Sequence, residues 1–170
     1  MIISSSLPPM NNNYHLHNKP EREITDKDEI TRILKNGKYA VLSLCKDNEP
    51  YVVTLSYGCN EQADALYFHC GKEGMKLDFI RANPVVCATV IEDNGYVPDV
   101  CTHRYRTVVL RGRIETLTNL EEMRQGMKIL LNHLEDNSTV MNKVNDNLAL
   151  YEKLAVLKLT ITHIHGKARK

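Results

Sequence analysis

Residues 39–57 read YAVLSLCKDNEPYVVTLSY, and this stretch decides between the main classes of fold. Residues 39–44 form a short apolar run, which is typical of a buried strand. Residues 51–57 are rich in β-branched and aromatic side chains, which also favour a strand. The turn-forming residues 46–50 between them therefore predict a β-hairpin, whose two strands pair in antiparallel fashion.

The chain on either side of this hairpin predicts further strands and helices. Strands are expected at 65–70, 85–91, 107–117 and 156–164, and helices at 25–36, 73–83 and 118–134. Residues 92–103 have no clear period and contain Gly95 and Pro98, so we expect a loop there. Strands and helices do not alternate regularly, which argues against a repeated βαβ fold. We expect a mainly β protein, a small six-stranded antiparallel barrel with peripheral helices.

Several residues predict where these elements begin, end or pack closely. Thr25 is expected to open a capping box, and Gly37 suits a left-handed helix end. Thr118 or Asn119 is expected to cap the third helix. Within the long strand, Gly112 lacks a side chain and therefore permits close packing or a bend.

The composition suits one globular domain and argues against several classes of function. The chain has 170 residues, 42% of them hydrophobic, and its net charge of +1 gives no general attraction for nucleic acid. No apolar run approaches the roughly 20 residues of a membrane helix. We expect a polar, disordered tail at 1–20 and one domain at 21–170. Five cysteines without a C-x-x-C pair predict free thiols in a reducing cytoplasm.

Residues 67–78, YFHCGKEGMKLD, bring together several chemically capable side chains. His69 and Cys70 are adjacent in a predicted strand, so their side chains should point to opposite faces and not form a nucleophile–base pair. The amides of residues 73–76, together with Lys72 and Lys76, could bind a phosphate at the start of a helix. The alternative is that these lysines are only solvated.

Two other groups of side chains are candidate sites. The run HRYR at 103–106 could grip a phosphate through arginine, or it could be a solvated loop. Cys101 with His103, and His163 with His165, could each supply two metal ligands. A structural zinc site needs four ligands, so we expect no metal site.

Three runs in this order resemble the pyridoxamine 5′-phosphate oxidase-like flavoproteins, and in particular their Nim branch, the 5-nitroimidazole resistance proteins. The runs are PYVVTLSYG at 50–58, ALYFHCGKEGMKLDFIRANPVVCATV at 65–90 and HRYRTVVLRGRIETL at 103–117. The resemblance extends over residues 21–170. It implies a six-stranded FMN-binding split β-barrel that forms a homodimer, with FMN, or alternatively FAD, at the subunit interface.

The resemblance also implies which residues lie beside the cofactor. They are Val53, Thr54, Phe68, His69, Cys70, Met75, Lys76, Arg104, Arg106 and Thr107. Met75 stands where the oxidase has a basic residue, so binding of the flavin phosphate depends more heavily on Lys76. His69 is the candidate catalytic residue, as a proton donor, unless it only hydrogen-bonds to the neighbouring turn.

The activity that the resemblance implies is flavin-dependent reduction of a small aromatic or nitro compound by an external reductant. Oxidation of vitamin B6 is not expected, because the oxidase residues that bind pyridoxal phosphate have no clear counterpart here. One alternative is a flavin carrier or sensor without turnover. Another is a haem-binding barrel with His69 or His103 as ligand. None of these functions involves nucleic acid or a membrane.

Overall fold

The computed structural model describes residues 19–135, 140, 144 and 147–169, so the expected tail at 1–20 lies almost wholly outside the described residues. In chain order the elements are η1 (Pro20–Arg22), β1 (Glu23–Ile24), α1 (Lys27–Asn36), β2 (Tyr39–Lys46), β3 (Glu49–Ser56), β4 (Gly58–Cys59), β5 (Ala65–Gly71), α2 (Met75–Ala82), β6 (Val85–Val97), β7 (Thr102–Thr116), α3 (Leu120–Leu134), α5 (Leu148–Lys153) and β8 (Leu154–Arg169).

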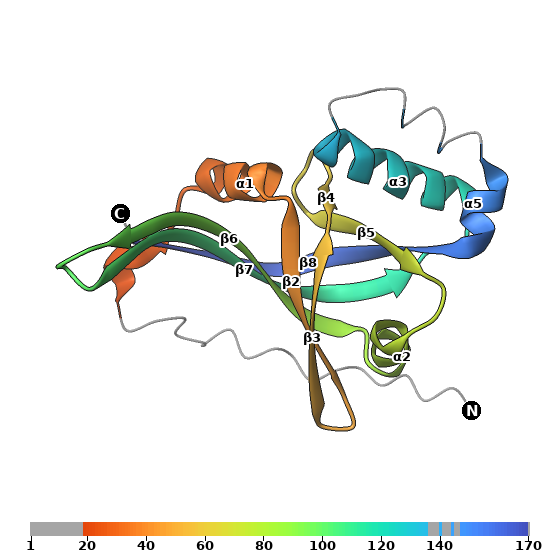
Figure 1. Ribbon diagram of the computed structural model, residues 1–170, viewed down its shortest axis with the longest axis horizontal. Coiled ribbons are helices and arrows are strands. Elements are labelled where there is room, and N and C mark those ends of the chain that lie inside the picture. Colours follow the sequence, from red (N-terminus) through yellow and green to blue (C-terminus); the bar gives the residue numbers. More distant parts are fainter. Residues whose placement is uncertain (1–18, 136–139, 141–143, 145–146, 170) are drawn as a thin grey trace.

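The strands form one antiparallel sheet in the order β3-β2-β6-β7-β8-β5-β4, and β1 pairs with β8 outside this path (Figure 1). The eight described strands do not close into a complete barrel, since β3 and β4 end the path. The mainly β, antiparallel architecture with peripheral helices is confirmed, whereas the expected number of six strands is wrong. β1 and β4 have two residues each, too few to show a hydrophobic period.

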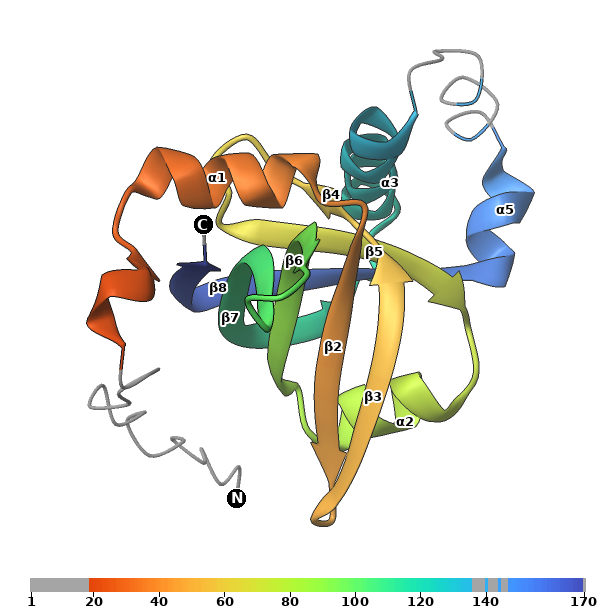
Figure 2. The same cartoon turned by 60° about the vertical axis from the view of Figure 1, so that its left-hand side comes forward.

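The helices lie at the periphery of the sheet. Figures 1 and 2 show α1 and α3 on one side of the sheet and α2 on the opposite side. Helix α5, which the sequence did not predict, immediately precedes β8, and Asn147 caps it by accepting from the Leu150 amide. Most of the expected polar break at 136–147 lies outside the described residues. Among the residues described, no helix has the length and apolar character needed to cross a bilayer.

The hairpin of β2 and β3 confirms the prediction made from residues 39–57. Its strands pair from Tyr39 with Ser56 to Lys46 with Glu49, which leaves Asp47 and Asn48 in the turn. Both turn residues have positive φ, 50° and 64°. A two-residue turn of this kind matches the right-handed twist of the strands, and Asp and Asn tolerate its left-handed backbone better than most residues do.

The region 92–103, expected to be a loop, is instead the outer half of a second hairpin. β6 runs on to Val97 and β7 begins at Thr102. The register between the two strands shifts between Asp93 and Tyr96, and Gly95 at this shift has φ of 85°. The irregularity interrupts the alternation of side chains, so the sequence shows no period here although the backbone stays paired.

One face of the sheet carries the main core. On β7, the side chains of Val108, Leu110 and Ile114 are at most 1% exposed. A Cβ atom at Gly112 would collide with the carbonyl oxygen of Thr160 on β8, and the register between β7 and β8 shifts at the same point. The predicted close packing at Gly112 is therefore confirmed.

Both ends of α1 differ from the expectation, whereas the start of α3 agrees with it. Asp26, not Thr25, caps α1, because its side chain accepts from the Asp28 amide at 2.9 Å. Gly37 is extended, with φ of −65°, so the expected left-handed helix end is wrong. A side chain at Gly37 is excluded by crowding instead, since a Cβ atom would lie 2.5 Å from the Tyr57 hydroxyl. Asn119 caps α3, as one of the two predicted candidates.

Replacing Gly112 by alanine is expected to lower the free energy of unfolding by about 1–3 kcal/mol, because the strand backbones must move apart. Urea unfolding followed by circular dichroism measures the change. Gly71→Ala is the matched control in a strand, because the nearest atom to its added Cβ is 4.0 Å away. Equal stability of the two variants would contradict this account of Gly112.

Candidate functional site

The end of β5, the loop after it and the first turn of α2 form the strongest candidate site, here called the β5–α2 junction (residues 69–76). Gly74 is the N-cap of α2 with φ of 127°, a conformation that side chains rarely permit. Its carbonyl accepts from the Leu77 amide at 2.9 Å and from the Asp78 amide at 3.3 Å. The amides of Met75 and Lys76 come earlier in the helix and have no intrahelical acceptor, so they can bind an anion.

The charge of Lys76 reaches the Cys70 thiol at this junction. Burial raises the pKa of the Cys70 thiol, and the positive charge of Lys76 opposes that shift. Lys76 is half-buried, whereas Lys72 and Glu73 are exposed. The junction therefore presents one positioned cation with unpaired amides beside it, and the Glu73 carboxylate is free to stay in solvent.

The three predicted residues at the end of β5 face different surroundings. Phe68 is 0% exposed in the main core, so only its backbone is available to a ligand. Cys70 packs against the same core, while His69 is exposed. The side chains of His69 and Cys70 thus lie on opposite faces of β5, as predicted.

Strand β3 is the free edge of the sheet and lies against α2. The rings of Tyr51 on β3 and Phe79 on α2 are 5.2 Å apart. Val53 packs against the main core, whereas Thr54 is exposed on the other face of the strand. Lys46 and Glu49 close the two-residue turn as a hydrogen-bonded pair, and such pairs recur at every second residue along the hairpin. Thr54 lies at one of the positions in between, so its backbone N–H and C=O point away from β2 and toward the free edge. β3 can therefore offer both donors and acceptors to a ligand at this edge.

The predicted residues at the start of β7 do not join the junction within one chain. Figure 1 shows the outer half of the β6–β7 hairpin projecting away from α2. Arg106 binds Glu29 at 2.8 Å and Glu92 at 2.7 Å. The hydroxyl of Thr107 lies 2.9 Å from that of Thr89. Arg104 is exposed.

The candidate metal ligands do not form a metal site in the described part of the chain. No group of three or more His, Cys, Asp or Glu side chains comes close enough there to hold an ion. His103 instead pairs with Asp93, at 2.7 Å. All five cysteines are free thiols.

A sequence profile of the family described as pyridoxamine 5′-phosphate oxidase matches residues 26–168, which is most of the chain. The chain belongs to this family. An uncharacterised protein from Rhizobium meliloti is 27% identical over 94 residues. That match covers 55% of this chain and 56% of the relative, so it spans little more than half of either protein.

Solved structures of similar proteins confirm the split-barrel fold of this family. A candidate 5-nitroimidazole antibiotic resistance protein from Bacteroides thetaiotaomicron has 24% identity and a TM-score of 0.72, with 86% of each chain covered. An FAD-binding protein from Mesorhizobium loti has 25% identity and a TM-score of 0.65, with 88% of this chain and 98% of that chain covered.

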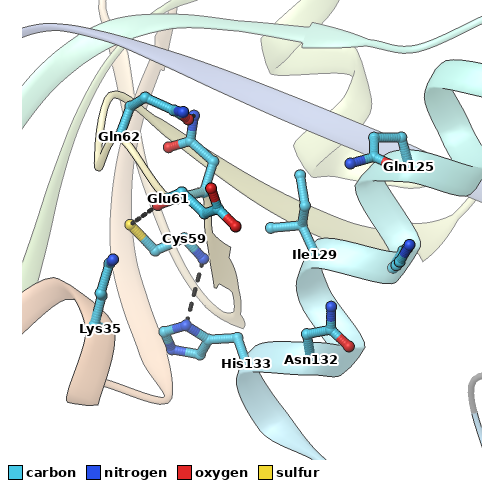
Figure 3. Close-up of a pocket in the computed structure, with 10 residues that line it drawn as sticks. Lys35, Cys59, Glu61, Gln62, Gln125, Ile129, Asn132 and His133 are labelled. Atoms are coloured by element: carbon cyan, nitrogen blue, oxygen red, sulfur yellow. Dashed lines mark hydrogen bonds between the residues drawn. The ribbon is translucent and has the colours of Figure 1, made fainter. Parts of the chain in front are cut away.

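A cavity of about 740 Å³ lies between the end of α1, β4 and α3, away from the β5–α2 junction (Figure 3). His133 on α3 contributes to its wall. The His133 Nδ1 atom accepts from the Cys59 amide at 3.4 Å, and Nε2 lies 2.5 Å from the Gly37 carbonyl oxygen. A carbonyl oxygen only accepts, so Nε2 carries the proton and the ring is neutral. Burial lowers the pKa of His133, which favours that neutral form.

Sequence reasoning did not find this cluster. His133, Cys59 and Gly37 are separated by 74 and 96 positions in the chain, and none of them belongs to a recognisable motif. Burial also raises the pKa of the Cys59 thiol to about 11, so it is protonated at neutral pH and not a nucleophile. Through its two hydrogen bonds, His133 links α3 to β4 and to the end of α1.

Acidification is expected to destabilise the fold through His133. Because its pKa is lower in the folded state than the unfolded value of about 6.5, the stability it contributes is complete above that value and is lost as the pH falls toward the folded pKa. His133→Gln should lose about 1–3 kcal/mol at pH 8 through the missing hydrogen bonds. It should also lose less further stability than the wild type between pH 8 and pH 5.

Urea unfolding at several pH values tests this expectation. The control is His165→Gln, which removes an exposed histidine from β8. If His133→Gln and the wild type lose the same stability on acidification, the histidine is not the group responsible.

Proposed function

We propose that the protein is a homodimeric flavin-binding oxidoreductase that reduces a small aromatic or nitro compound with an external reductant. The observation that carries the proposal is the β5–α2 junction beside the free edge of β3, in a chain that belongs to the pyridoxamine 5′-phosphate oxidase family. The similarity to a candidate 5-nitroimidazole resistance protein and to an FAD-binding protein supports both the flavin and the type of substrate.

The residues present fit the phosphate of a flavin. Unpaired amides at Met75 and Lys76, the dipole of α2 and the Lys76 ammonium together meet the needs of a phosphate group. The Met75 side chain carries no charge, but its backbone amide can donate a hydrogen bond to the phosphate. The exposed Glu73 side chain can turn away into solvent.

The edge of β3 fits the polar side of the flavin ring. Thr54 turns its backbone groups toward that edge, and Val53 and Tyr51 give the strand an apolar side against the core and α2. A bound flavin supplies the transfer of hydride or electrons. The chain itself holds the ring against β3 and anchors the phosphate at Lys76.

His69 is the proposed proton donor. It is exposed at the end of β5, so a substrate can reach its ring from solvent. It lies on the other face of β5 from Cys70, so a substrate protonated by His69 would lie on the exposed face of this strand.

A second copy of the chain is the proposed partner, bound on the face of the sheet opposite the core. Cross-strand pairing aligns Thr54, Val41, Thr89 and Val109 on this outer face. Exposed apolar side chains gather on it: Tyr39, Val52 and Ile91 are 56%, 59% and 51% exposed. A patch of this kind on a sheet marks a protein interface. The partner's β6–β7 hairpin would then bring its Arg104 region toward the junction.

Flavin binding is expected to give the purified protein a yellow colour and a flavin absorption spectrum. Lys76→Ala should weaken flavin binding by ~1.5–3 kcal/mol, the scale of a charge-assisted hydrogen bond. Fluorescence quenching during titration measures the dissociation constant. Lys27→Ala, which removes the lysine at the start of α1, is the matched control and should bind like the wild type.

The spectrum also separates the alternatives. Protein that stays colourless and takes up neither FMN nor FAD would rule out the proposal. A Soret band in place of flavin peaks would select haem. Bound flavin without turnover of a nitroimidazole and a nicotinamide reductant would select a carrier or sensor.

Val52→Glu is expected to convert the dimer into a monomer, because a charge on the outer face would be buried without a partner. Light scattering coupled to size-exclusion chromatography measures the mass. Ala149→Glu on α5 adds the same charge elsewhere and should leave the dimer intact. A monomeric wild type, or a dimeric Val52→Glu variant, would show that this face is not the interface.

A further inference from the structure

The cavity between the end of α1, β4 and α3, here called the α1–α3 cavity, has a lining that is mostly charged and polar. Lys35 contributes to its wall from the last turn of α1, and Lys128 contributes from α3. The cavity volume of about 740 Å³ is within the range of sites that bind small organic molecules. The proposed flavin site does not use any of these residues.

Helix α3 presents several lining residues on one of its faces. Gln125, Lys128 and Asn132 are three and four positions apart, a spacing that places side chains on the same side of a helix. Figure 3 shows Gln125, Ile129 and Asn132 across the cavity from Lys35. A molecule in the cavity would therefore meet an ammonium, two carboxamides and one apolar side chain from this helix, and a second ammonium from α1.

Positive charge acts on the floor of the cavity. Burial raises the pKa of the Cys59 thiol, and the Lys35 ammonium opposes this shift more strongly than the Asp64 carboxylate adds to it. Cys59 belongs to the cavity lining, so the Lys35 charge reaches the interior of the cavity. A further ammonium lies at the same end, because Lys38 donates to the carbonyl oxygen of His133 at 3.0 Å. This end of the cavity therefore favours an anion.

The polar side chains on the two helical walls take no part in holding the fold. Within the part of the chain that the structure describes, Lys35, Lys128, Gln125 and Asn132 form no hydrogen bond or ion pair with another residue. Their donors are thus available to a ligand. His133 differs from them, because both of its ring nitrogens are already engaged.

The connection between β4 and β5 gives the cavity a fixed rim. Asn60 Oδ1 accepts from the amides of Asp64 and Ala65, each at 3.1 Å, and Asn60 Nδ2 donates to Asp64 Oδ1 at 2.6 Å. These bonds order the backbone that carries Glu61 and Gln62, both of which line the cavity. A rim that is ordered before binding lowers the entropic cost of binding a ligand.

We propose that the α1–α3 cavity binds a small organic dicarboxylate. Lys35 and Lys128, on different walls, each pair with one carboxylate. The carboxamides of Gln125 and Asn132 donate to the remaining carboxylate oxygens, and the carbon chain of the ligand packs against Ile129. The Glu61 side chain is exposed at the rim and stays in solvent. This site goes beyond the proposed function, because it lies away from the β5–α2 junction.

Isothermal titration calorimetry of the full chain with glutarate tests the proposal. Lys35→Gln and Lys128→Gln each remove one charge from the cavity and keep a polar side chain there. Lys153→Gln is the matched control, because it removes an exposed lysine of α5 outside the cavity lining. Wild type and Lys153→Gln should bind glutarate equally within twofold, whereas each cavity variant should bind it at least fivefold more weakly.

Two further probes separate the charges of the ligand from its shape. Glutaramide, the uncharged diamide of the same length, should not compete with glutarate, and inorganic phosphate should bind at least tenfold more weakly. Thermal unfolding checks that each variant is folded. A wild type that does not bind glutarate, cavity variants that bind it like the wild type, or a glutaramide or phosphate affinity equal to that of glutarate would overturn the dicarboxylate site.

Flavin binding, measured on the same preparations, keeps this inference separate from the proposed function. Lys35→Gln and Lys128→Gln should bind flavin like the wild type, because both residues lie outside the β5–α2 junction. An equal loss of flavin and glutarate binding in these variants would show a general defect of the fold and overturn the assignment of the two lysines to a separate site.

Discussion

The pairing of β7 with β6 on one side and β8 on the other is the constraint on which the rest of the structure depends. Side chains alternate along β7, so Val108, Leu110 and Ile114 enter the core while Val109 belongs to the outer face. The register transmits this choice to every strand that pairs further along the sheet. A slip by one residue would turn the whole core set outward, and the tight approach of Gly112 to Thr160 helps to hold the register.

The candidate site follows from the order of the strands and from their pairing. The order leaves β3 as an unpaired edge, and its register with β2 turns the backbone of Thr54 toward that edge. The loop after β5 leads directly into α2. Helix α2 is fixed there by Phe79, whose ring packs on Tyr51. The half-buried Lys76 is positioned by a helix that is itself held by the core, which gives its charge a defined location.

Features that depend on neighbours in sequence could be predicted from the sequence. The hairpin at 39–57, the Asn119 cap and the opposite orientation of His69 and Cys70 are examples. Features that depend on distant partners could not. Arg106 pairs with Glu29, 77 positions away, and His133 joins Cys59 to Gly37. The extension of β6 and β7 through 92–103 was missed because a local irregularity hides the alternation while backbone pairing continues.

The sequence by itself determined the antiparallel, mainly β architecture, the family and the lysine-bearing junction after β5, because each is encoded by residues within a few positions of one another. Only the tertiary structure decided that Lys76 is half-buried and that Arg106 pairs with two carboxylates. It also decided that His133 on α3 accepts from the Cys59 amide of β4. These arrangements depend on how strands far apart in the chain align, and the period of one strand does not specify that alignment.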